Sequence, residues 1–181
     1  MSNSFHQAFI TACNTPSDIH EHLPTLNLLA KLCQHVTEFG VRWGTSTLAW
    51  LNNDVTVHAY DIERFAESQE LFEQARLAGK NAYFWQHDTL SLGAIAPTDL
   101  LFIDSLHTYQ QVRGELEYAK FVNKFIVLHD TVLFGHQGQD GTTPGILQAV
   151  QEFLDANRDW TVMEHRTNNN GLMILVRREY L

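Results

Sequence analysis

Two short apolar runs, over 99–103 and 125–128, constrain the fold of this chain most strongly. Each run is nearly continuous, which is typical of a central strand that is buried on both faces of a parallel sheet. Between them, apolar residues such as Val112 and Leu116 recur at helical spacing, so we expect a helix over about 108–122. A buried strand, a helix and a second buried strand in succession predict the α/β class with a mostly parallel sheet.

The rest of the chain continues this alternation and ends in a hairpin. Asn170-Gly171 indicates the hairpin, because Asn-Gly is the strongest short signal for a tight turn between two strands. Residues 1–34 are expected to form an N-terminal helical extension, and residues 35–181 a single domain. Strands are expected over 35–38, 55–60, 81–86, 99–103, 125–128, 160–165 and 172–177, and helices over 24–34, 46–51, 63–79, 108–122 and 146–156.

Composition excludes several classes of function. The net charge of −9 argues against a broad phosphate-binding surface, so nucleic acid is not an expected partner. No stretch comes near ~18 consecutive apolar residues, so we expect no membrane span. The first residues lack a basic start followed by an apolar run, so we expect no signal peptide. Cys13 and Cys33 have no metal-site spacing and are expected to be reduced thiols in a cytoplasmic protein.

The stretch over 35–47 predicts a ligand site. It joins a short β-branched strand that ends at Glu38, a turn that contains Gly40 and Gly44, and a helix that opens over 45–47. At a glycine the backbone can approach a ligand closely, and the N-terminus of a helix attracts anionic and polar groups. The alternative is a helix-capping turn that binds no ligand.

The spacing of the glycines separates the candidate ligands. The dinucleotide fingerprint G-x-G-x-x-G, counted from Gly40, would require glycines at Arg42 and Thr45, so an NAD enzyme is disfavoured. Asp61 ends the next strand, 21 residues after Gly40, where an acid can bind the two hydroxyls of a ribose. Asp61 therefore supports an adenosine-containing ligand without choosing which one. A solvated loop acid is the alternative at this position.

Polar residues gather at the ends of the expected strands. Ligands of open parallel sheets bind at the carboxyl ends of the strands. Five strands end in an acid or in a pair of histidine and aspartate, which loop composition alone does not explain. The residues concerned are Glu38, Asp61, Asp88, Asp104 with His107, and His129 with Asp130.

Asp104 and Asp130 predict a metal site, because they end two apolar runs that we expect to be adjacent strands. Converging carboxylates suit Mg²⁺ or Mn²⁺, and His129 is a candidate third ligand or an acid–base residue. His107 follows Asp104 by three residues at the entry to a helix. An imidazole with an unperturbed pKa near ~6.5 is suited to taking a proton from a substrate hydroxyl. Loop capping by the acids and a helix-terminal histidine without chemistry are the alternatives.

Two motifs resemble those of known methyltransferases. Glu38, Gly40 and Gly44 match motif I of class I S-adenosylmethionine (SAM) methyltransferases, E-x-G-x-G-x-G, with Arg42 at the middle glycine. Asp104-Ser105-Leu106-His107-Thr108-Tyr109, followed by Leu128-His129-Asp130-Thr131, resembles the metal-dependent small-molecule O-methyltransferases related to macrolide-sugar methyltransferases and the cephalosporin-hydroxylase-like group. The resemblance covers about residues 35–178.

This resemblance implies a Rossmann-like class I methyltransferase fold, with a mostly parallel seven-stranded sheet in the order 3-2-1-4-5-7-6 and a C-terminal antiparallel hairpin. It implies a transferase that uses SAM and Mg²⁺, or another divalent cation, to methylate a hydroxyl of a small-molecule acceptor. His107 would be the base and Asp104 its catalytic neighbour, and Asp104, His129 and Asp130 would hold the metal. The cofactor would be held by Glu38, Gly40, Arg42, Gly44, Thr45 and Ser46 at its methionine end, by Asp61 and Ile62 at the ribose, by Asp88 and Thr89 at the adenine, and by Asp104.

Two further functions stay open at this point. The same aspartates and histidines could hold Fe(II) in a non-heme hydroxylase-like enzyme, as the cephalosporin-hydroxylase-like relatives suggest. The chain could also be a SAM-binding protein without catalysis. Relatives are often oligomers, so a homo-oligomer is a candidate assembly, and the apolar surface of the helix over 1–12 offers a contact for it.

Overall fold

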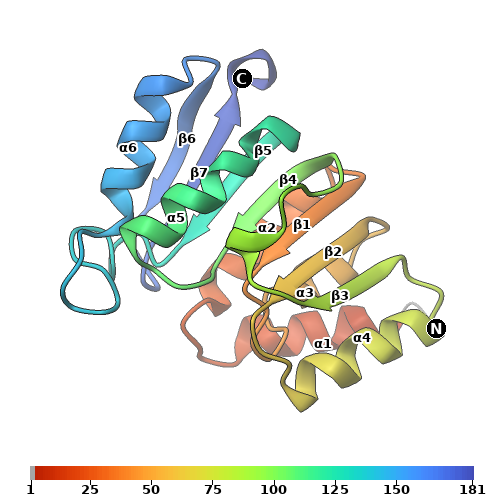
Figure 1. The fold of residues 1–181 in the computed structure, drawn as a ribbon. Helices are drawn as coiled ribbons and strands as arrows, with labels where there is room; N and C mark the ends of the chain where they lie inside the picture. The colour runs from red at the N-terminus through yellow and green to blue at the C-terminus, as the bar shows by residue number, and fades with distance from the viewer. Residues whose placement is uncertain (1–2) are drawn as a thin grey trace.

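The computed structural model describes residues 3–181, which form one seven-stranded sheet in the order β3-β2-β1-β4-β5-β7-β6 (Figure 1). Strands β1 to β5 pair in parallel, and β7 runs antiparallel to both β5 and β6. This arrangement confirms the predicted fold class, strand order and C-terminal hairpin. The strands are β1 (His35–Phe39), β2 (Thr56–Asp61), β3 (Ala82–Gln86), β4 (Thr98–Ile103), β5 (Val122–His129), β6 (Trp160–Arg166) and β7 (Leu172–Arg177).

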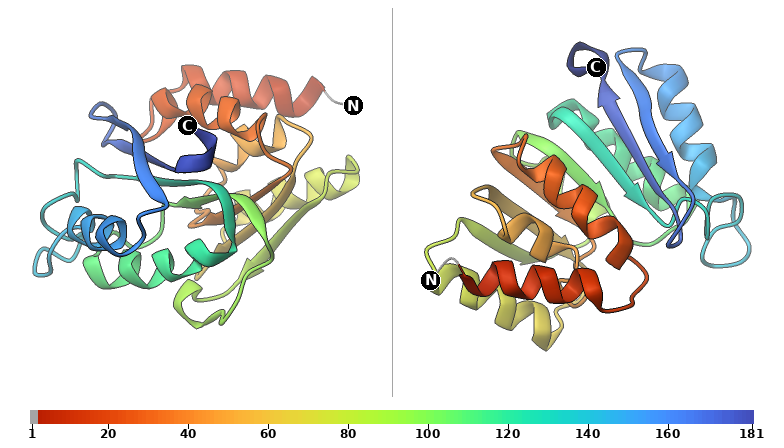
Figure 2. Two further views of the ribbon diagram at one scale, coloured as in Figure 1. Left: turned by 90° about the horizontal axis from the view of Figure 1, so that it is seen from above. Right: turned by 180° about the vertical axis from the view of Figure 1, so that it is seen from behind.

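Helices cover both faces of the sheet and make it the middle of three layers (Figure 2). Apolar residues of the first four helices pack in one core cluster, and those of the last two pack in a second cluster on the opposite face. The first layer holds α1 (Asn3–Asn14), α2 (Leu23–Ala30), α3 (Thr47–Leu51) and α4 (Ala66–Leu77). The second layer holds α5 (Tyr109–Leu116) and α6 (Ile146–Ala156).

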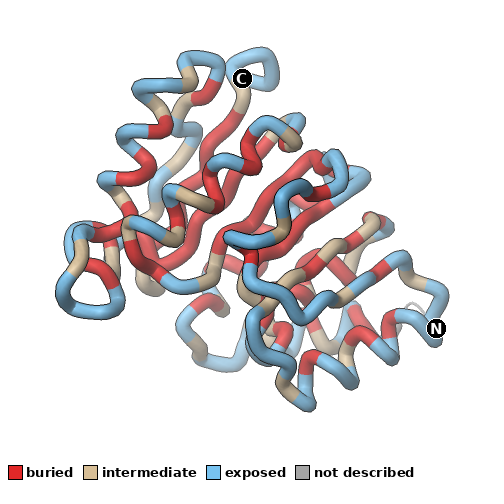
Figure 3. The backbone as a smooth tube through the Cα atoms, viewed as in Figure 1, coloured by how far each residue is buried: buried red, intermediate tan, exposed pale blue. Residues whose placement is uncertain are grey.

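The central strands are buried along most of their length (Figure 3). All six residues of β4 are buried, and the last five residues of β5 are buried as well. A strand that is covered on both faces favours apolar residues at successive positions, which is why these two runs are continuous rather than alternating. The carboxyl ends of β1, β2, β4 and β5 therefore meet at one edge of a rigid scaffold.

The N-terminal helices belong to the same core as the sheet. Phe5 and Phe9 of α1, with Leu23 and Leu26 of α2, lie in the cluster that also contains buried residues of β1 and β4. Both parts of the chain share this core, and the division after residue 34 stays a prediction. Residues 1–2 of the expected N-terminal extension lie outside the described residues. The segment that precedes α2 also touches the β6–β7 hairpin, where Asn169 Nδ2–H donates to the Ser17 carbonyl over 2.9 Å.

Some element boundaries differ from the expected ones. The helix expected over 108–122 ends at Leu116 and continues as a 3₁₀ helix, Glu117–Phe121, because the chain enters β5 at Val122. The helix expected over 24–34 ends at Ala30, and that over 63–79 is shorter at both ends. Within residues 3–181, none of the helices combines the length and the hydrophobicity that crossing a lipid bilayer requires.

Candidate active site

The turn after β1 requires glycine at position 40. Gly40 has φ +84°, and a Cβ built on it would lie 2.1 Å from the carbonyl oxygen of Asp104 at the end of β4. Asp61 holds the other side of the turn, because its Oδ2 accepts the backbone N–H groups of Val41 and Arg42 over 2.7 and 2.8 Å. The turn is thereby fixed between the ends of β2 and β4.

Glu38 lies beneath this turn rather than in the open cleft. Its carboxylate is fully buried and accepts hydrogen bonds from Ser46 Oγ–H over 2.6 Å and from Thr47 Oγ1–H over 2.7 Å. Burial raises the pKa of Glu38 to about 7, against the opposing effect of the two hydroxyl donors. Glu38 therefore fixes the start of α3 to the end of β1.

Two cavities meet at the carboxyl ends of the strands and form one cleft. A cavity of about 380 Å³ extends over the ends of β2 and β3, and a cavity of about 430 Å³ extends over the ends of β4 and β5. They share five lining residues, Gly40, Arg42, Asp104, Ser105 and Gln139. Of the residues predicted to bind the cofactor, those that line the cleft are Gly40, Arg42, Thr45, Ser46, Asp61, Ile62, Asp88, Thr89 and Asp104, whereas Glu38 and Gly44 line neither cavity.

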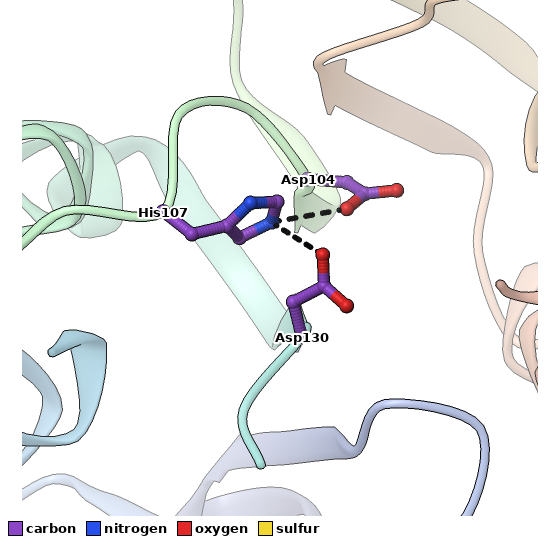
Figure 4. A group of neighbouring side chains, drawn as sticks. All are labelled: Asp104, His107 and Asp130. Atoms are coloured by element: carbon purple, nitrogen blue, oxygen red, sulfur yellow. Dashed lines mark hydrogen bonds and ion pairs between the residues drawn. The ribbon is translucent and has the colours of Figure 1, made fainter. Parts of the chain in front are cut away.

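Asp104, His107 and Asp130 converge in the second cavity (Figure 4). His107 Nε2 lies 3.2 Å from Asp104 Oδ1 and 3.5 Å from Asp130 Oδ2. One ligand atom from each of the three residues falls within 4.8 Å of the others, which is the spacing of a metal-binding group. Asp130 has φ +58°, and its buried Oδ1 has no hydrogen-bond partner among the described residues, although His129 Nδ1 lies 3.7 Å from it. A buried carboxylate oxygen without a donor is costly unless a ligand supplies the missing partner.

The charges of this group stabilise one another. Burial acts to raise the pKa of Asp104, but the charges and hydrogen bonds of His129 and His107 outweigh it and hold that pKa well below its usual range. Burial acts to lower the pKa of His107, but Asp104 and Asp130 raise it. Burial raises the pKa of Asp130, whose carboxylate has weaker partners. The ionised form of Asp104 is therefore favoured by the two imidazoles beside it.

His129 lies beside Asp104 and Asp130 but is not part of the group that His107 forms with them, so its role as a metal ligand stays a prediction. Its Nδ1 lies 3.1 Å from Asp104 Oδ1, and its Nε2 lies 3.1 Å from the Asp18 carbonyl and 3.3 Å from the Asn169 carbonyl. Burial acts to lower the pKa of His129, but the charge of Asp104 raises it to about 9. With an acceptor at each nitrogen, the imidazolium form of His129 is favoured and donates at both ends.

Comparisons with known proteins identify the fold. No family model and no curated protein sequence matches the chain. Among solved structures, the O-methyltransferase from Bacillus cereus with S-adenosylhomocysteine (SAH) has a TM-score of 0.66 and 19% identity, over 98% of this chain and 90% of that one. The O-methyltransferase TomG from Streptomyces achromogenes with SAM has a TM-score of 0.65 and 18% identity, over 94% and 89%. The N-methyltransferase NodS from Bradyrhizobium japonicum with SAH has a TM-score of 0.64 and 12% identity, over 96% of this chain and 98% of that one.

The chain has the class I methyltransferase fold.

Within this methyltransferase fold, a buried network that we did not predict supports the first cavity. Glu115 of α5 is fully buried and accepts hydrogen bonds from Thr89 Oγ1–H over 2.6 Å, from Ser105 Oγ–H over 2.7 Å and from Gln111 Nε2–H over 2.9 Å. Burial raises its pKa. The sequence carried a signal for it, because Glu115 follows Val112 by three residues and so falls on the apolar face of the helix.

Three segments of the methyltransferase fold supply walls of the second cavity that the sequence did not connect with it. Asp18 precedes α2, Asn170 lies at the tip of the β6–β7 hairpin, and Phe134 follows β5. Asp18 forms an ion pair of 3.3 Å with Arg42, and the Arg42 guanidinium lies 4.0 Å from the centroid of the Trp43 ring. The glycine turn is thus tied to the N-terminal segment across the mouth of the cavity.

Proposed function

We propose that this protein is a SAM-dependent methyltransferase that methylates a hydroxyl of a small molecule with the help of a divalent cation. One observation carries the proposal, which is that Asp104 lines both cavities. The half of the cleft whose residues are expected to bind a nucleotide therefore meets the half that holds the carboxylates and the imidazole at this residue. A cofactor in the first half would direct its reactive end toward the second. Two solved structures of the same fold hold SAM or SAH, which supports SAM as the cofactor.

The first cavity has the residues that an adenosine needs. Asp61 accepts backbone N–H groups at Oδ2 and Oδ1, and a carboxylate has lone pairs left for the hydroxyls of a ribose. Asp88 and Thr89 lie beyond it at the end of β3, where an adenine would extend. SAM supplies a methyl group that is already activated on a sulfonium, so the protein has mainly to position the two reactants and remove a proton.

The second cavity fits a divalent cation. Asp104 and Asp130 would hold it, and His107 Nε2 faces Oδ1 of Asp104 and Oδ2 of Asp130. Two carboxylates with one imidazole suit Mn²⁺ or Mg²⁺ with waters in the remaining positions. A bound cation lowers the pKa of a hydroxyl that it contacts. His107 Nε2 either completes this set of ligands or takes the proton of the acceptor, and metal dependence distinguishes the two roles.

The preference for an oxygen acceptor rests on this cavity and not on the fold, because an N-methyltransferase has the same fold. Carboxylates that gather a cation favour an acceptor with oxygen ligands of its own. A volume of about 430 Å³ is in the range of pockets that bind small molecules. An imidazole beside two carboxylates also suits Fe(II), so an iron-dependent hydroxylase is the competing assignment.

The test begins with calorimetric titration of SAM and of NAD⁺ into the purified chain and into two variants. Asp61→Ala should lose SAM binding, and the exposed Asp54→Ala, a matched control, should retain it. Methyl transfer from SAM is then measured on a panel of sugars, catechols and polyketide hydroxyls, with Mg²⁺, Mn²⁺ or a chelator. Asp130→Asn should lose metal-stimulated transfer.

The outcomes separate the candidate functions. Absence of SAM binding by folded protein would overturn the proposal. Bound iron with turnover of 2-oxoglutarate would establish the hydroxylase instead. A SAM-binding protein without catalysis would be favoured if the chain binds SAM but transfers no methyl group to any acceptor, and if Asp104→Ala and His107→Ala bind SAM as the wild type does. Transfer that survives chelation would remove the cation from the proposal and leave His107 as the base.

A further inference from the structure

The two edges of the sheet are built differently. β6 forms one edge, and it carries Glu164 and Arg166 and shifts its register with β7 between Val162 and Glu164. A bulge and charged side chains are features that keep an edge strand from pairing with another chain. β3 forms the other edge, and its five residues, Ala82–Gln86, include no proline, no charged side chain and no register shift against β2 (Figure 1). The edge at β3 is therefore open to a further strand.

The outward hydrogen-bonding groups of β3 belong to alternate residues. On the inner side, the Asn81 carbonyl accepts a hydrogen bond over 2.8 Å and the His87 N–H donates one over 2.7 Å, both with residues of β2. Backbone N–H and C=O groups alternate between the two sides of a strand, so the odd-numbered positions face β2. Ala82, Phe84 and Gln86 therefore direct their backbone groups away from the sheet, where a partner strand would lie.

The face of β3 that points away from α4 has no helix over it. Tyr83 and Trp85 lie on this face and are 48% and 40% exposed, whereas Ala82, which alternates with them, is buried in the core with residues of α4. The connection from β3 to β4 contains only a 3₁₀ helix, Thr89–Ser91, although parallel strands are usually joined by an α-helix. Parallel sheets are normally covered on both faces, so these two aromatic rings lack the cover that the fold usually provides.

On the α4 side, the edge borders a groove with charges of both signs. The groove has a volume of about 380 Å³, and its lining includes Phe84, Arg64, Glu73 and Arg76. The Arg64 guanidinium lies 5.0 Å from the centroid of the Phe84 ring. A second copy of this groove offers carboxylates to guanidinium groups and guanidinium groups to carboxylates, so the surface is complementary in charge to itself.

A two-fold axis at Phe84 also makes the strand complementary to itself. In an antiparallel pair about this axis, Phe84 would face Phe84 of the second copy as a hydrogen-bonded pair, which uses the outward backbone groups. Tyr83 of each copy would then face Trp85 of the other in a non-hydrogen-bonded pair, where side chains come closest. Aromatic residues opposite each other stabilise a sheet, and tyrosine and tryptophan are enriched in protein interfaces.

We propose that β3 is the homodimer interface of this chain and pairs in antiparallel fashion with β3 of a second copy. The pairing joins the two sheets into one continuous sheet and covers the exposed rings of Tyr83 and Trp85. It closes on itself, because both copies use the same edge, and the bulged and charged β6 edges stay at the outside. The contact is separate from the one that α1 offers, and it does not depend on the proposed methyltransferase activity.

The first measurement is sedimentation velocity of the purified chain over a range of concentrations, where we expect a reversible equilibrium of monomer and dimer. Tyr83→Lys combined with Trp85→Lys places like charges opposite each other twice and should weaken the dimer by more than about 10-fold. Tyr83→Lys combined with Trp85→Glu places opposite charges there and should restore much of this loss. Met163→Lys replaces an exposed apolar residue of the β6 edge, and as the matched control it should leave the equilibrium unchanged.

The second measurement tests the register by disulfide cross-linking in a Cys13→Ser background, in which the remaining Cys33 is buried. The Cα atoms of a non-hydrogen-bonded pair are about 4.5 Å apart, which a disulfide can span. A mixture of the Tyr83→Cys and Trp85→Cys proteins should therefore cross-link with oxidised glutathione. Tyr83→Cys alone should not, because the two positions 83 lie on a diagonal of about 7–8 Å.

The outcomes decide the proposal without reference to SAM. A wild type that stays monomeric at every concentration would overturn it, including the case in which β3 pairs with a strand of a different protein. A dimer that persists unchanged in Tyr83→Lys with Trp85→Lys would place the contact elsewhere, for example on α1. Cross-linking of Tyr83→Cys alone as readily as of the mixture would refute the register. Circular dichroism establishes that each variant is folded, and the wild type and the charge-paired variant keep the test decisive if the variant with two lysines is not.

Discussion

Replacing Glu38 with glutamine should remove a loss of stability that occurs as the pH rises. The folded chain buries this carboxyl completely, and burial raises its pKa from 4.5 to about 7. In the unfolded chain the group is exposed and has its ordinary pKa. Between these two values, the folded state holds a proton that the unfolded state has released. Stability is therefore retained below pH 4.5 and lost as the pH rises toward about 7.

The magnitude follows from the separation of the two pKa values. They differ by about 2.5, and each unit corresponds to about 1.4 kcal/mol, so the full effect is about 3.5 kcal/mol. Over the accessible interval from pH 5 to pH 8, the same linkage gives about 2.5 kcal/mol. Glutamine should fit the site, because its amide oxygen can accept from Ser46 Oγ–H and the Thr47 hydroxyl can accept from its NH₂ group.

The assay is urea unfolding of the wild type and Glu38→Gln at pH 5, 6, 7 and 8, followed by fluorescence and by circular dichroism. Coincident transitions justify a two-state free energy of unfolding. The quantity of interest is the difference between the proteins, because titrations that they share, such as that of His129, largely cancel. We expect the advantage of Glu38→Gln to grow by about 2.5 kcal/mol from pH 5 to pH 8. A constant difference, or one that shrinks as the pH rises, would refute the argument that burial outweighs the two hydroxyl donors.

Two further predictions concern the frame of the cleft. Gly40→Ala should lower the free energy of unfolding by more than about 2 kcal/mol, since its Cβ would meet the Asp104 carbonyl at φ +84°, whereas Gly79→Ala, with φ +76° but open space, should lower it by only about 1 kcal/mol. Equal losses in urea unfolding would contradict this account. Thr89→Val should cost about 1–3 kcal/mol because it removes a donor from the buried Glu115 carboxylate, while Thr89→Ser should cost clearly less in the same assay; identical costs would show that the hydroxyl does not contribute.

The positions of the main strands could be predicted because their signals are local. The run over 99–103 could be buried on both faces only in a central strand, and the structure places it at the centre of the sheet as β4. Once the strands are located, the residues at their carboxyl ends are known too. Asp61, Asp88 and Asp104 could therefore be placed at one edge of the sheet, where they line the cleft. The strand order itself came from the resemblance, since nothing local to a strand specifies its neighbour.

The residues that were missed lie where distant segments meet. Gln139 is one glutamine among several in a glycine-rich loop, and only the folded chain brings its amide to His107. Glu115 was partly accessible, because its place on the apolar face of a helix marked it as buried. Two of its three donors, Thr89 and Ser105, lie outside this helix, and periodicity cannot reveal them.

By itself, the sequence determined a parallel sheet with acids and histidines at its carboxyl edge, because hydrophobic period and strand-end position are properties of short segments. Only the tertiary structure decided which histidine faces the cavity. His129 ends β5, and His107 follows β4 closely. Nε2 of His129 faces the backbone carbonyls of Asp18 and Asn169. In contrast, Nδ1 of His107 faces Gln139, and its Nε2 faces the carboxylates. The role of an imidazole depends on the partners of both its nitrogens, and here those partners lie far away in the sequence.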